Sequence, residues 1–188
     1  MKQRIFSCLL VTLIFFCSCS KSEDDAKPEE YTPQYVSYYG TPVFEVPYTN
    51  FGVTKDQVKQ TLKNRALKEE TADKLVYEGV DDTAFQAYYF ESDKLIEATT
   101  YIKNIQKGAM IKDALGLTYK YWGDATGPIS PIYVYANQSF YVGLTKQTND
   151  TWMVVFVPHD RVTYKENTGN GEITIDLPSI IKSKEYLK

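Results

Sequence analysis

The sequence predicts an α+β fold: two tandem units, each a helix followed by three strands, forming one antiparallel sheet with the helices packed on one face. Three observations lead there. A helix-capping signal begins an apolar pattern of helical spacing. The chain is rich in aromatic residues, with 16 tyrosines, and many of them fall in alternating runs typical of strands. The order of helix and three strands then recurs, over about residues 53–103 and 108–159.

The first unit opens with "FGVTKDQVKQTL". Thr54 followed three residues later by Gln57 is the signature of a capping box, so the sequence predicts that a helix starts at Thr54. Val58, Leu62 and Ala66 recur at helical spacing and predict one buried stripe. The runs "KLVYEGV", "AFQAYYF" and "KLIEATTYI" that follow, separated by turn residues, predict three antiparallel strands.

The second unit opens with "GAMIKDALGLTYKYWG", whose residues Ile111, Ala114, Leu115, Thr118 and Trp122 share one helical face. The runs "PIYVYAN", "SFYVGLTK" and "TWMVVFVP" again predict three strands. Residues 160–188 carry two more short runs, "RVTYK" and "EITIDL", joined by the turn-rich "ENTGNG". We expect a C-terminal hairpin there that extends the sheet.

The two units resemble a known family. The entry pattern "NFGVTKDQVKQTL" and the later "YYFESDKLIEATTYI" are similar to the β-lactamase-inhibitor-protein fold and the related SmpA/OmlA outer-membrane assembly lipoproteins. The resemblance covers Phe51 to about His159 and lacks the disulfides of the secreted inhibitor. It implies the tandem helix-and-sheet fold, whereas function does not follow from fold alone.

The first 18 residues have the pattern of a lipoprotein signal peptide. A basic start is followed by the apolar run "IFSCLLVTLIFF", which is shorter than the roughly 20 residues that span a bilayer. Ser18 is small enough to precede the cleavage site, so Cys19 becomes the first mature residue, as in the lipobox of bacterial lipoproteins that this stretch resembles. We therefore expect a lipid on Cys19, a polar acidic tether over 19–34, and a single domain over 35–188.

Localisation and charge follow from the same segment. The run Ser22-Glu23-Asp24-Asp25 resembles the surface-export signal of Bacteroidetes lipoproteins, with an ordinary charged linker as the alternative. We expect an exported outer-membrane lipoprotein, held at the membrane by its lipid. Removal of the signal lowers the number of basic residues from 21 to 19 against 24 acidic ones, a formal charge of −5. Such a balance disfavours nucleic acid as a partner.

The inventory of reactive residues predicts no enzyme, no cofactor and no metal site. His159 is the only histidine, and Cys19 is the only cysteine of the mature chain. A multi-histidine metal site is therefore excluded, as is an intramolecular disulfide. The Gly residues form neither a P-loop nor a dinucleotide-binding motif. We expect His159 to be a half-exposed residue at the end of a strand.

The alternation in the strands suggests a binding face. Tyr133 and Tyr135 point away from Ile132 and Val134, so if the helices cover the apolar face, the tyrosines stand on the open one. The predicted binding face consists of Tyr77, Tyr88, Tyr133, Tyr135, Tyr141 and Trp152.

Such a face would suit a protein partner, or alternatively a glycan whose rings stack on the tyrosines. The plain alternative is that the tyrosines pair across strands and only stabilise the sheet. A small carboxylate-dependent hydrolase is a third, less favoured interpretation. Separately, Asp82-Thr83-Ala84 resembles the acceptor motif for Bacteroidetes O-glycosylation, which makes Thr83 a candidate modification site.

Overall fold

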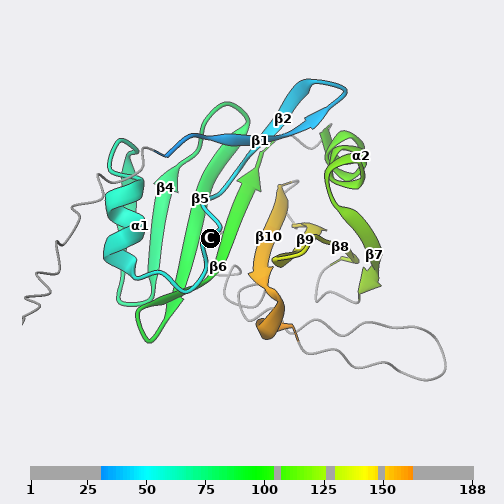
Figure 1. The fold of residues 1–188 in the computed structure, drawn as a ribbon. Helices are drawn as coiled ribbons and strands as arrows, with labels where there is room; N and C mark the ends of the chain where they lie inside the picture. The colour runs from blue at the N-terminus through cyan, green and yellow to red at the C-terminus, as the bar shows by residue number, and fades with distance from the viewer. Residues whose placement is uncertain (1–30, 104–106, 126–129, 148–150, 163–188) are drawn as a thin grey trace, which may run out of the picture.

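A computed structural model describes residues 31–103, 107–125, 130–147 and 151–162 of the 188-residue chain. Figure 1 shows their arrangement. The elements are β1 (Gln34–Tyr38), β2 (Thr41–Val46), α1 (Lys55–Thr61), β3 (Leu67–Glu70), β4 (Lys74–Glu78), β5 (Thr83–Glu91), β6 (Lys94–Ile102), α2 (Gly108–Thr118), β7 (Lys120–Ala125), β8 (Ile132–Ala136), β9 (Phe140–Lys146), β10 (Trp152–Pro158) and the short 3-10 helix η2 (His159–Arg161).

Eight of these strands form one antiparallel sheet in the order β3-β4-β5-β6-β10-β9-β8-β7. Strands β3 to β6 pair in sequence order, and so do β7 to β10. The two runs join where β10 pairs with β6, which places β3 and β7 at opposite ends of the described sheet. Strands β1 and β2 form a separate hairpin, whose turn holds Tyr39 and Gly40 at positive φ.

The predicted start of α1 is confirmed. The Gln57 amide N–H donates to the Thr54 hydroxyl, and the Thr54 amide N–H donates to the Gln57 side-chain oxygen at 2.8 Å. Val58 and Leu62 are buried as predicted, but Ala66 is exposed because the helix ends at Thr61 with Leu62 as its C-cap. The stripe is therefore one turn shorter than the sequence pattern suggests.

The replacement Thr54→Ala is expected to lower the free energy of unfolding by about 1 kcal/mol, because the N-terminal turn of α1 loses its side-chain acceptor. Leu62→Ala should cost more, about 2–5 kcal/mol, since it leaves a cavity beside Val58. Chemical denaturation of both variants checks this, and equal losses would contradict the assignment of the helix face.

The predicted fold class is wrong. The described part of the chain is mostly β, with one eight-stranded sheet, one two-stranded sheet and two α-helices, and it is not a pair of units with one helix and three strands each. Two strands come from segments that look helical. The charged run "LKEE" forms β3, and "KYWGDA", which we expected to continue the second helix, forms β7. The hairpin β1–β2 lies before either predicted unit.

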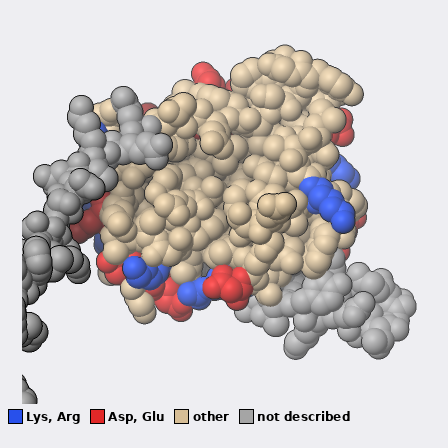
Figure 2. All heavy atoms as spheres, in the orientation of Figure 1, with Lys and Arg blue, Asp and Glu red and all other residues tan. Residues whose placement is uncertain are grey.

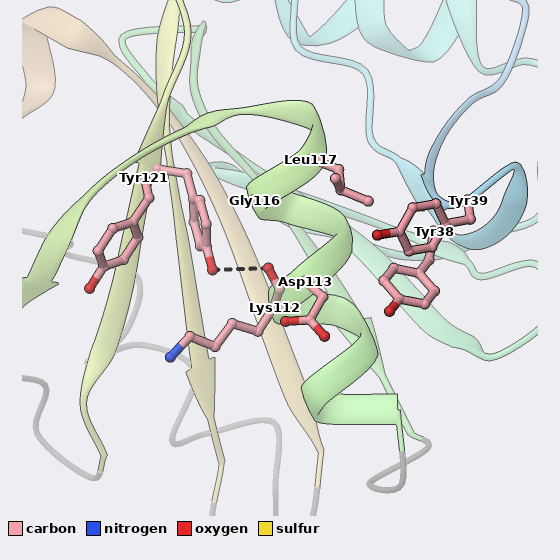
Figure 3. Close-up of a pocket in the computed structure, with 8 residues that line it drawn as sticks. Tyr38, Tyr39, Lys112, Asp113, Gly116, Leu117 and Tyr121 are labelled. Atoms are coloured by element: carbon pink, nitrogen blue, oxygen red, sulfur yellow. Dashed lines mark hydrogen bonds between the residues drawn. The ribbon is translucent and has the colours of Figure 1, made fainter.

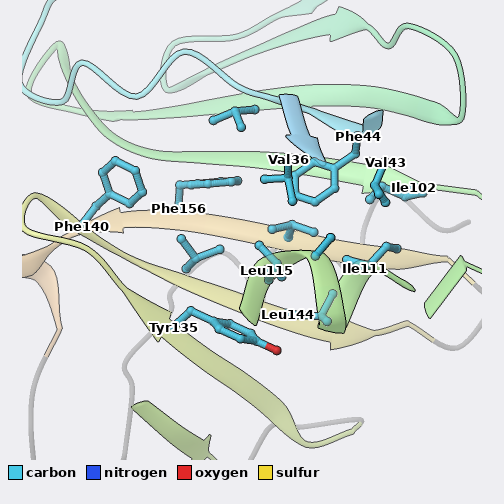
Figure 4. Packing of buried hydrophobic residues seen from close by; sticks show 14 residues of the cluster. Val36, Val43, Phe44, Ile102, Ile111, Leu115, Tyr135, Phe140, Leu144 and Phe156 are labelled. Atoms are coloured by element: carbon cyan, nitrogen blue, oxygen red, sulfur yellow. The ribbon is translucent and has the colours of Figure 1, made fainter. Parts of the chain in front are cut away.

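Both faces of the sheet are apolar, and neighbouring residues on a strand contribute to different clusters. On β10, Val154 and Phe156 belong to the first-face cluster, whereas Met153 and Val155 belong to the second-face cluster. Side chains of α2 and of the hairpin complete the cluster on the first face (Figure 4). A third cluster joins α1 to β4, β5 and β6 through Val58 and its neighbours. The core therefore lies on both sides of β6 and β10.

Candidate functional site

Most of the predicted binding face is buried. Tyr77, Tyr88 and Tyr135 are at most 2% exposed. Tyr133 and Trp152 are half-buried and pack against the first-face cluster, and the Lys112 ammonium lies 3.7 Å from the centre of the Tyr133 ring. The prediction that these aromatic side chains form one open face is therefore wrong.

The alternation itself was predicted correctly, and the error lies in which side is covered. Tyr133 and Tyr135 do point away from Ile132 and Val134, but they point toward α2. The Tyr135 hydroxyl donates to the Lys112 carbonyl oxygen on α2 at 3.1 Å. Tyr141 pairs with Ala136 and lies on the second face, so it does not share a face with the other two.

Two other predicted positions have different outcomes. Thr83 is 5% exposed and its hydroxyl oxygen is buried, so a glycosyltransferase could not reach it in the folded domain. Its modification stays a prediction for the unfolded chain only. Cys19, the tether up to residue 30 and the predicted hairpin beyond Val162 lie outside the described residues.

The structure instead forms a groove around the C-terminal half of α2, which we call groove 1. Its volume is about 510 Å³. Its lining residues are Tyr38, Tyr39, Lys112, Asp113, Gly116, Leu117, Tyr121 and Tyr135. In Figure 3, Leu117 projects from α2 between Tyr121 on β7 and the Tyr38–Tyr39 pair at the hairpin tip. Groove 1 is thus built from three segments that are far apart in the sequence.

The aromatic rings of groove 1 are held by neighbouring side chains. The Tyr38 and Tyr39 rings meet edge to face, with 4.6 Å between their centres, and Tyr121 packs against Tyr135 at 5.5 Å. The Tyr121 hydroxyl donates to the Asp124 carboxylate at 2.5 Å, and this hydrogen bond is the main reason that the pKa of Tyr121 rises to about 12. Tyr121 therefore stays neutral and points in a fixed direction at physiological pH.

A second groove, groove 2, lies on the other side of β7. Its volume is about 500 Å³, and its lining residues are Thr118, Tyr119, Lys120, Trp122, Ala136, Asn137, Gln138, Tyr141 and His159. The Tyr141 ring lies 5.0 Å from Trp122 and 4.6 Å from His159. His159 is exposed and directly follows β10, close to its predicted place. The adjacent residues Tyr121 and Trp122 thus serve two different grooves.

Exposed apolar side chains gather at this end of the molecule. Four of the large hydrophobic residues that are exposed in the described ranges lie here: Tyr39 (81%), Leu117 (58%), Tyr121 (49%) and Trp122 (37%). We call these four residues the aromatic end. Charged atoms lie mainly along the rim of the view in Figure 2. At β3, the opposite end of the sheet, ion pairs such as Lys68–Glu78 and Lys74–Glu69 cover the surface with charge.

No residue set in the described ranges has the composition of a metal centre, since no three His, Cys, Asp or Glu side chains come together there. Nor is any helix in those ranges long and apolar enough to cross a membrane. Groove 1 contains one carboxylate, Asp113, and groove 2 contains none. The chemistry that both grooves offer is therefore apolar and aromatic contact with a polar rim.

Comparison with known proteins adds no template. No family model, no curated protein and no solved structure matched the chain. A function for this protein has to be inferred from its own residues.

Proposed function

We propose that this protein is a lipid-anchored, non-enzymatic binding module of the cell envelope, which holds a protein partner at the aromatic end. One observation carries the proposal: Tyr39, Leu117 and Tyr121 come from three separate elements and line one shallow groove while remaining 49–81% exposed. A soluble surface seldom exposes large apolar groups together unless they bind something. Tyr is also enriched at protein interfaces, because it combines a large contact area with a polar tip.

The shape of groove 1 favours a protein over a small ligand. A small-molecule site encloses most of its ligand, whereas groove 1 spreads across α2 from the hairpin tip to β7. Gly116 keeps its middle low, because no atom would lie within 4 Å of a side chain added there. Lys112 and Asp113 provide one charge of each sign at the rim. This arrangement fits an apolar anchor residue of a partner, surrounded by polar contacts.

The double variant Tyr39→Ser/Tyr121→Ser is expected to lose the partner and to keep its stability. Both side chains are exposed, so the loss in unfolding free energy should stay near 0.5 kcal/mol per site. A photo-crosslinking residue placed at position 39 or 121 in living cells should yield the same discrete protein. Mass spectrometry identifies it, and thermal unfolding of the purified variants checks that the fold is intact.

Leu67→Ser is the matched control, since Leu67 is 40% exposed on β3 at the opposite end of the sheet. A crosslinker at position 67 should not capture the partner, and the Leu67→Ser variant should still bind it. The proposal is wrong if positions 67 and 121 yield the same proteins, or if the double variant binds as well as the parent.

A glycan is the second candidate, and groove 2 is the observation that favours it. Three neighbouring rings, from Trp122, Tyr141 and His159, lie beside the side-chain amides of Asn137 and Gln138. Rings can stack on the apolar face of a sugar while amides bind its hydroxyl groups. If Trp122→Ala abolishes binding of a purified cell-surface polysaccharide while Tyr39→Ser/Tyr121→Ser does not, the glycan function replaces the protein-binding one.

The membrane anchor is a separate part of the proposal. Cys19→Ala should release the mature protein from the membrane fraction, because the lipid has no other attachment point, whereas Cys17→Ala should leave it bound. Fractionation and intact mass measure both variants. A membrane-bound, lipidated Cys19→Ala protein would mean that the anchor is elsewhere.

A further inference from the structure

The second face of the sheet is buried at its centre. Ala87, Thr99, Tyr101, Met153 and Val155 are all 0% exposed. Alternation places them on the face opposite Val154 and Phe156, and the β6–β10 register pairs Met153 with Tyr101 and Val155 with Thr99. Side chains in one plane cannot shield one another from water above that plane. A layer of chain must therefore lie over this face.

Within the described ranges, the helices and the hairpin do not supply that layer. The side chains of α1, α2, β1 and β2 belong to the clusters of the other side. The second-face cluster contains residues of the sheet and one residue from outside it, Val162. Val162 is the last described residue, so the chain leaves the described domain on this face.

We propose that residues 163–188 lie across the second face and cover it. This segment of 26 residues begins next to Val162 and carries the apolar run "ITIDLPSII", with Ile173, Ile175 and Leu177 alternating with polar residues. The sheet is about 35 Å wide, since neighbouring strands lie about 4.8 Å apart. A chain of this length reaches across it easily, at about 3.3 Å per extended residue.

Charge and composition select this segment over the other end of the chain. The second face includes Glu97, which is 3% exposed and accepts a hydrogen bond from the Thr99 hydroxyl at 2.9 Å. Residues 163–188 bring Lys182 and Lys184 to a face that holds this carboxylate. Residues 20–30, "SKSEDDAKPEE", are acidic and have no large apolar residue to place against the cluster.

Intramolecular photo-crosslinking tests the proposal in the full-length mature protein. A benzophenone side chain is introduced at Phe85 or at Tyr141, two half-buried positions of the second-face cluster, and at Tyr38 on the other side as the control. After digestion, positions 85 and 141 should crosslink to peptides from residues 163–188, and position 38 should not. Crosslinks to residues 19–30, to another molecule or to no part of residues 163–188 would overturn the proposal.

A second experiment uses substitutions in the segment. Ile175→Asp/Leu177→Asp should raise the fluorescence of the apolar dye ANS several-fold and lower the melting temperature, because the second face becomes accessible. Thr168→Asp, in the turn-rich "ENTGNG", should change neither. Unchanged dye binding and melting in the double variant would contradict the proposal. If that variant does not fold, the crosslinks in the parent background still decide.

Discussion

Replacing Glu45 with Ala is expected to lower the free energy of unfolding by about 3–5 kcal/mol, because it leaves the Arg65 guanidinium without its buried partner. Glu45 on β2 is 1% exposed, and its carboxylate accepts from the Arg65 guanidinium, which is 12% exposed. Arg65 also donates to the Gln86 side-chain oxygen at 2.9 Å. The Gln86 amide in turn donates to the Glu45 carbonyl oxygen at 3.3 Å.

This network joins the hairpin to the large sheet. Burial raises the pKa of the Glu45 carboxyl, and the Arg65 guanidinium acts in the opposite direction. The ionised carboxylate is therefore tolerated only because Arg65 and the Tyr31 hydroxyl bind it. Removing one partner exposes the other to the full cost of an uncompensated buried charge.

Urea denaturation of Glu45→Ala measures the loss, with Glu78→Ala as the control. Glu78 pairs with Lys68 at 3.0 Å, but both side chains are more than half exposed, so its loss should cost at most about 1 kcal/mol. The joint replacement Glu45→Leu/Arg65→Met should recover much of the stability, since it removes both charges. Equal losses for Glu45→Ala and Glu78→Ala would contradict this account.

Phe156→Ala is expected to cost a similar amount, about 3–5 kcal/mol, because it opens a cavity in the first-face cluster. Phe156 on β10 is 0% exposed, and its ring lies 5.7 Å from that of Phe140. In a domain of about 150 residues each kcal/mol lowers the melting temperature by roughly 2–4 °C, so a fall of about 10 °C is expected. Differential scanning calorimetry measures it.

Tyr39→Ala is the control for this loss, because Tyr39 is 81% exposed and its removal leaves no cavity. Its unfolding free energy should change by about 0.5 kcal/mol or less. A small effect of Phe156→Ala would mean that the cluster collapses around the missing ring.

Local signals in the sequence were sufficient for some elements. The capping box at Thr54 acts within one turn, so its residues alone predicted the start of α1. Alternation in "PIYVYAN" likewise separated Tyr135 from Val134. The charged run "LKEE" has no such signal, and it forms a strand only because β4 pairs with it and because Lys59 and Lys74 pair with its carboxylates.

The aromatic end could not be predicted because it depends on tertiary packing. Tyr39, Leu117 and Tyr121 are 78 or more positions apart or belong to different elements, and they meet only when the hairpin packs on α2. The same packing buries Tyr135, which local alternation had suggested as an open residue. Which face a strand exposes is decided by the elements that cover it, and the strand's own residues do not encode them.

The contacts of Tyr31 have a mechanical consequence. Its hydroxyl donates to the Glu45 carboxylate and to the Val46 carbonyl oxygen, both at 3.1 Å, just ahead of the first β1–β2 pair, Gln34 with Val46. In the anchored protein that we propose, tension from the membrane enters the domain at this residue. The force meets the Tyr31 hydroxyl first and can peel β1 from β2 only after those bonds break. Tyr31→Phe would therefore weaken the hairpin against pulling more than against heat.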